Sequence, residues 1–94
     1  MSDLTELRQA HAYIADALFC SDLKDGTAPT PRQISAAIRE AIKANRGADG
    51  CTEAVARKFA EQPKASSRRL EWCRRLAEQV LSAGDITFGA GGRA

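Results

Sequence analysis

The sequence has few of the residues that build catalytic and metal sites. Its 94 residues include one histidine, and aromatic residues make up only 5%. It contains no glycine-rich phosphate loop, no nucleophile motif and no cluster of ligands at metal-binding spacing. We therefore expect a protein that is not an enzyme and that needs no cofactor and no metal ion.

Cysteine is also scarce, and its spacing excludes the usual uses. Cys20, Cys51 and Cys73 form an odd, widely separated set without a CxxC pair, unlike a disulfide framework or a zinc site. The pattern predicts three small buried side chains in a reducing compartment. The alternative is a reactive thiol at Cys73, which Arg74 and Arg75 follow. Adjacent helix positions point in different directions, so this neighbourhood is weak support.

Long hydrophobic runs are absent, and none approaches the ~20 residues of a membrane span. The first residues are acidic, whereas a secretory signal begins with basic residues. These features predict a cytoplasmic protein without a membrane partner.

Alanine and arginine dominate instead. There are 18 alanines, and the ten arginines outnumber the four lysines. Both are good helix formers, and their abundance is typical of a GC-rich bacterium or its phage. The net charge of +2 is uneven, since residues 1–30 carry −3 and residues 31–94 carry +5. The basic part favours an anionic partner.

Hydrophobic spacing predicts an all-α fold, a compact bundle of four helices with a short extended C-terminal tail. A single domain is expected over residues 1–88, with an extended piece at 85–88 and a disordered glycine-rich tail at 89–94. The clearest start is at Thr30, where Pro31 and Gln33 complete a capping box. The predicted helices span about 3–23, 31–46, 50–62 and 66–83.

The helix predicted at 31–46 carries basic residues opposite its apolar side. This cation strip consists of Arg32, Arg39, Lys43 and Arg46. Charges of one sign repel each other along a helix, which favours a surface that binds phosphates or a partner's carboxylates. The alternative is a solvated face, with countercharges from Glu6, Asp16 and Asp22. By contrast, the arginines of helix 66–83 have glutamates four residues away, as in Glu71–Arg75 and Arg74–Glu78.

Arg69 and Trp72 form a second candidate for partner binding. Arg69 falls within the apolar sector of helix 66–83, and Trp72 falls at its edge. Either Arg69 extends its charged end past the core, or it stacks on Trp72 at a contact surface.

The helix predicted at 3–23 has an apolar stripe made of Leu4, Leu7, His11, Ile14 and Leu18. His11 is its one polar member. The simpler interpretation is a hydrogen-bonded histidine at the edge of the core. The alternative is a pH-sensitive residue at a self-association seam.

Residues 55–76 suggest a helix-turn-helix, because an arginine-rich helix follows a short one. Lys64, Arg68 and Arg69 are the possible nucleic-acid contacts. The segment AEQPKASS between the helices is longer than the usual turn of 3–4 residues, which weakens this reading. The leading expectation is a small non-enzymatic module that binds another protein or forms a homodimer. The alternative is a nucleic-acid-binding helical domain that acts as a small regulator.

Overall fold

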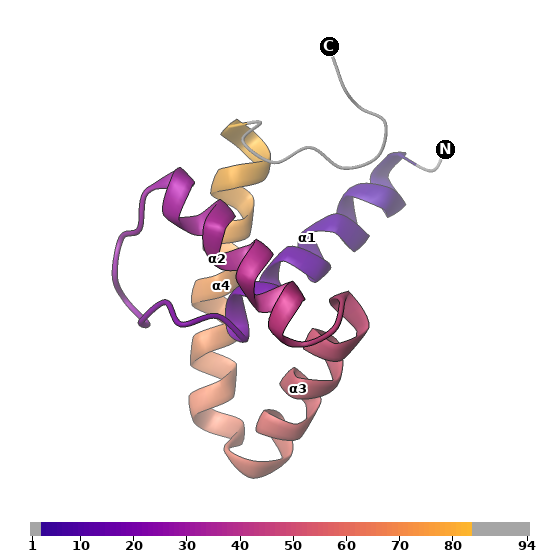
Figure 1. Cartoon of the computed structure of the whole chain (residues 1–94), viewed down its shortest axis with the longest axis vertical. Helices are drawn as coiled ribbons and strands as arrows, with labels where there is room; N and C mark the ends of the chain where they lie inside the picture. Colours follow the sequence, from indigo (N-terminus) through magenta and orange to yellow (C-terminus); the bar gives the residue numbers. More distant parts are fainter. Residues whose placement is uncertain (1–2, 84–94) are drawn as a thin grey trace.

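The computed structural model describes residues 3–83, with side chains from 5 to 82, and this part of the chain consists of four helices without a strand. Figure 1 shows α1 crossing the molecule, α2 and α3 beside it, and the long α4 along one side. The predicted all-α bundle is confirmed, while the calls on residues 85–88 and 89–94 lie outside the described residues. The helices are α1 (Asp3–Phe19), α2 (Pro31–Ala44), α3 (Ala48–Glu61) and α4 (Pro63–Ala83).

The core lies where α1 meets the other three helices, with all of which it is in contact. Residues at helical spacing supply it from every helix, and each fully buried aliphatic side chain contributes about 1.5–3 kcal/mol. Its largest fully buried side chains are Ile14, Leu18, Ile34, Val80, Cys51 and Cys73.

α1 ends at Phe19, four residues before the predicted end. The Ser21 hydroxyl donates to the carbonyl oxygen of Leu18 at 2.6 Å and accepts from the backbone N–H of Leu23 at 3.2 Å. These local bonds compete with the helical bonds that would continue α1. Leu23, four residues after Phe19, still fits the apolar spacing, so spacing alone did not reveal this helix end.

α2 begins as predicted and ends two residues early. Thr30 and Gln33 form both bonds of the capping box, and Pro31 is the first helical residue. At the other end, Arg46 takes the left-handed conformation with φ of 63°. The backbone N–H of Gly47 donates to Ile42 at 2.8 Å, and that of Arg46 donates to Lys43 at 3.3 Å. This bond pair is a Schellman motif.

α3 begins at Ala48 rather than at residue 50, because the chain turns directly from one helix into the next. Gly47 holds the N-cap position with φ of 112°, and Asp49 lies in the first turn. Gly50 packs against the turn so closely that a Cβ there would lie 1.7 Å from the carbonyl oxygen of Asn45. This contact fixes the direction of α3 relative to α2.

α4 begins at Pro63 rather than at residue 66. Pro63 is the first residue of α4, since its φ suits the first helical turn. The backbone N–H of Ser66 donates to Gln62 at 2.9 Å, within the first turn of α4. A single residue, Gln62, therefore separates the two helices, where the sequence suggested a longer connection.

Candidate interaction surfaces

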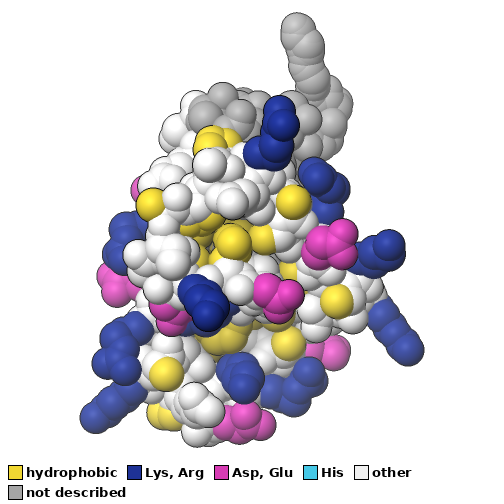
Figure 2. All heavy atoms as spheres, turned by 60° about the vertical axis from the view of Figure 1, so that its left-hand side comes forward, with side chains coloured by type: hydrophobic (Ala, Val, Ile, Leu, Met, Phe, Trp, Pro, Cys, Tyr) yellow, Lys and Arg dark blue, Asp and Glu magenta, His cyan; other side chains and the backbone are white. Residues whose placement is uncertain are grey.

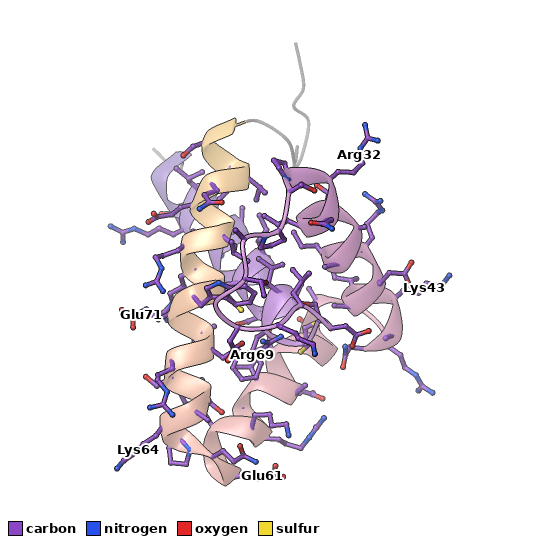
Figure 3. All side chains as sticks on the ribbon, turned by 90° about the vertical axis from the view of Figure 1, so that its left-hand side faces the viewer. Arg32, Lys43, Glu61, Lys64, Arg69 and Glu71 are labelled. Atoms are coloured by element: carbon purple, nitrogen blue, oxygen red, sulfur yellow. The ribbon has the colours of Figure 1, made fainter. Side chains whose placement is uncertain are left out.

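Burial of one side of α2 directs its basic residues outward. Ile34, Ile38 and Ala41 are buried, while Arg32, Arg39 and Lys43 are exposed. Figure 3 shows Arg32 and Lys43 pointing away from the bundle near opposite ends of the helix. At 1.5 Å per residue the two Cα atoms are roughly 16 Å apart along the axis. The helix thus displays its cations as a line.

The fourth member of the cation strip, Arg46, lies outside the helix. It is exposed and occupies the turn after the C-cap residue Asn45. The direction of its side chain therefore cannot be inferred from helical spacing. Arg46 adds an exposed cation in the turn beyond the end of α2.

The countercharges expected from α1 do not reach the cation strip. Within residues 3–83 the only ion pair joins Arg69 to Asp25. Asp16 instead accepts from the Thr52 hydroxyl at 3.0 Å, and Asp22 is exposed. The expected Glu71–Arg75 and Arg74–Glu78 pairs are likewise not in ion-pair contact. The cation strip still differs from these arginines of α4 in its surroundings. Glu40 is the only acidic residue of α2, whereas each of those arginines has a glutamate four residues away.

Arg69 is directed into the molecule, with an 18% exposed side chain. Its guanidinium donates to the carbonyl oxygens of Leu18, Phe19 and Ser21 at 3.2, 2.8 and 3.0 Å, and it pairs with Asp25. The carbonyls of Phe19 and Ser21 have no other hydrogen-bond donor among the described residues, whereas that of Leu18 also accepts from Ser21. A cation at this helix end is favoured by the helix dipole. In Figure 3 the side chain lies behind the segment that follows α1. Arg69 therefore closes the C-terminal end of α1.

Trp72 is 8% exposed and lies beside Arg69. The Arg69 guanidinium carbon is 5.7 Å from the ring centroids of both Trp72 and Phe19. The indole N–H donates to the carbonyl oxygen of Thr27 at 3.3 Å. The predicted stacking of arginine on tryptophan is present, but within the chain. In this arrangement both side chains hold residues 20–30 against α4.

Lys64 and Arg68 are exposed on the first turns of α4. They are four residues apart and share one side of the helix, whereas Arg69 points inward. In Figure 3 Lys64 projects outward at the end of the molecule where α3 meets α4, and in Figure 2 basic side chains project from both edges of the molecule. The one-residue connection between α3 and α4 is shorter than the turn of a helix-turn-helix, whereas the sequence suggested that it would be longer.

His11 lies in a groove between α1 and α4 that the sequence did not predict. Its Nε2 is 3.1 Å from the carbonyl oxygen of Arg74, and the groove has a volume of about 600 Å³. Burial raises the pKa of nearby Asp16, and the Thr52 hydroxyl and the charge of Arg74 lower it to a smaller extent. The sequence signal that could have predicted this groove was the apolar stripe on α1, which continues towards the N-terminus beyond the buried residues.

All three cysteines are free, and their surroundings disfavour the thiolate. Burial raises the pKa of Cys73 to about 12, a larger effect than the lowering by Arg69. Burial, reinforced by Cys51, raises the pKa of Cys20 to about 11. A reactive thiol needs a depressed pKa and access, so the arrangement suits packing rather than redox chemistry.

Comparison with protein-family models, curated proteins and solved structures finds no match for this chain. Among the described helices, none is long and apolar enough to cross a membrane. Residues 3–83 hold no group of three or more histidine, cysteine or acidic side chains that could bind a metal ion.

Proposed function

We propose that this chain is a small non-catalytic helical module that binds an acidic surface of a partner protein through the cation strip. The observation that carries the proposal is that Arg32, Arg39 and Lys43 share the outer face of α2 and have no ion-pair partner within residues 3–83. Arg39 and Lys43 are one turn apart, so their mutual repulsion favours a bound anion.

An acidic protein surface suits this line better than nucleic acid does. The chain carries a net charge of only +2, and Glu40 lies beside the cations on α2. Nucleic-acid affinity grows with the number of phosphates neutralised, whereas a few carboxylates spaced along one helix would match the strip. The proposed compartment is the cytoplasm, where the three free thiols would stay reduced.

The test measures binding of the full chain to a helical peptide with glutamates at i, i+4 spacing and to a short DNA duplex. Fluorescence anisotropy at low and near-physiological salt gives both affinities. The variant Arg39→Glu/Lys43→Glu is expected to lose the peptide. The control Arg57→Glu/Arg75→Glu makes the same charge change at exposed positions outside the strip and should lose less affinity.

Equal losses in the two variants would show that net charge, not the strip, drives binding.

The alternative function, nucleic-acid binding, rests on the exposed Lys64 and Arg68, which face the same way on α4. DNA binding that survives near-physiological salt and is lost in Lys64→Glu/Arg68→Glu would replace our proposal with that alternative.

A further inference from the structure

The groove between α1 and α4 exposes part of the apolar stripe of α1. Ile14 and Leu18 are 1% and 0% exposed, but Leu7, on the same stripe, is 53% exposed. The two helices splay apart beyond their crossing (Figure 1), and the groove lies between them. Leu70 and Leu81 of α4 line it and are only partly buried. Within residues 3–83, the first half of a helix-packing stripe is thus left uncovered.

The charges around this groove are balanced. Arg8 and Asp16 line it from α1, and Arg74 and Glu78 line it from α4. Their formal charges sum to zero, so the groove favours neither an acidic nor a basic partner. A surface with balanced and separated charges can instead match a second copy of itself.

The order of the charges on α1 specifies how two copies would meet. Arg8 and Asp16 lie four residues to either side of Ala12. If two α1 helices cross antiparallel with the two-fold axis near Ala12, Arg8 of each copy faces Asp16 of the other. Ala12 is exposed and small, which allows the backbones to approach closely at that point.

We propose that the α1/α4 groove is a self-association surface that joins two copies of this chain through antiparallel α1 helices. Leu7 of each copy packs into the groove of the other, and two Arg8–Asp16 pairs flank the axis. α2 does not line the groove, so a dimer presents two cation strips. Two strips would strengthen binding to a partner with repeated acidic sites, without any new contact.

The first test measures the solution mass of the full chain by light scattering over a concentration series. The wild type is expected to shift from 10.1 kDa towards twice that mass. Leu7→Lys should remain monomeric, because a lysine buried in the seam lacks a partner. The control Tyr13→Lys changes the other large exposed hydrophobic residue of α1, which lies outside the groove, and should dimerise as the wild type does.

A wild type that stays at 10.1 kDa throughout would overturn the proposal. If Leu7→Lys then also melts at a lower temperature than Tyr13→Lys, Leu7 is covered within a single chain. Equal loss of the dimer in both variants would likewise overturn it, because the seam would not involve Leu7 specifically.

The second test addresses the antiparallel register. Arg8→Glu and Asp16→Arg should each be monomeric alone, because like charges then face each other across the axis. An equimolar mixture of the two should form a heterodimer, since both facing pairs become opposite in charge. A mixture that stays monomeric while the wild type dimerises would overturn the register. Leu7→Lys leaves the cation strip unchanged. Its loss of the dimer can therefore be distinguished from a failure of the strip to bind the acidic peptide.

Discussion

Arg69 and Arg39 are the same residue type on two amphipathic helices, yet the structure uses them differently. Arg69 is enclosed by three carbonyl oxygens, the Asp25 carboxylate and two aromatic rings. Arg39 is exposed and forms no ion pair within residues 3–83. The difference arises from what lies opposite each side chain. A helix end faces Arg69, whereas solvent faces Arg39.

The comparison separates arginines that hold the fold from those that remain available for a partner. Hydrogen bonds from a charged donor to carbonyl oxygens are worth about 1.5–3 kcal/mol each. An exposed cation contributes little to stability, and a row of such cations is slightly unfavourable. The cation strip therefore has no evident structural use, which is what the proposed function requires.

The largest expected effect comes from removing Arg69. Arg69→Ala leaves the carbonyls of Phe19 and Ser21 and the Asp25 carboxylate without this partner, and should lower the free energy of unfolding by about 3 kcal/mol. Arg39→Ala should change it by less than about 0.5 kcal/mol. Urea denaturation followed by circular dichroism measures both values. Similar values for the two variants would break the comparison.

Arg69→Lys distinguishes charge from geometry at the same site. A lysine keeps the charge but replaces the planar set of donors with a single ammonium group. We expect a loss of stability between those of the wild type and Arg69→Ala. If Arg69→Lys is as stable as the wild type, the charge near the end of α1 suffices, and the individual hydrogen bonds add nothing.

The elements that the sequence predicted well are those whose determinants are local. The start of α2 was placed correctly because Thr30, Pro31 and Gln33 lie within four residues of one another. The end of α1 was misplaced because its stabilising partner Arg69 lies 50 residues beyond Phe19. Exposure of the cation strip followed from helical spacing alone, apart from the turn that contains Arg46. The α1/α4 groove depends on how far two helices diverge, which spacing does not encode.

Alkaline pH tests the interior near Arg69, with a smaller expected effect. The thiol of Cys73 has an ordinary pKa of 9.0, raised by burial to about 12 despite the nearby Arg69 charge. Between these values the unfolded chain loses the proton while the folded chain keeps it, so stability falls as pH rises above 9. The loss at pH 10 should be of order 1 kcal/mol for Cys73.

Denaturant midpoints at pH 7 and pH 10 measure this loss, and Cys73→Ala provides the control. The variant should be less stable at pH 7, because a buried side chain is shortened. It should then lose less stability between the two pH values than the wild type, with the remainder due largely to Cys20. An unchanged pH dependence in the variant would show that Cys73 ionises as readily in the folded chain as in the unfolded one.

The smallest expected effect concerns Arg46, the residue of the cation strip whose backbone is strained. Its φ of 63° suits glycine or asparagine at the end of a helix, so Arg46→Gly should raise stability by about 0.5–1 kcal/mol. The variant should also bind the acidic peptide more weakly and with a smaller salt dependence, since one cation is lost. Arg46→Asn tests the same point without adding backbone freedom to the unfolded chain.

A gain in stability with unchanged peptide affinity would show that Arg46 is not part of the binding surface, which would then be confined to α2. A gain in stability with weaker binding would show that the turn sacrifices stability to keep a cation that binds the partner.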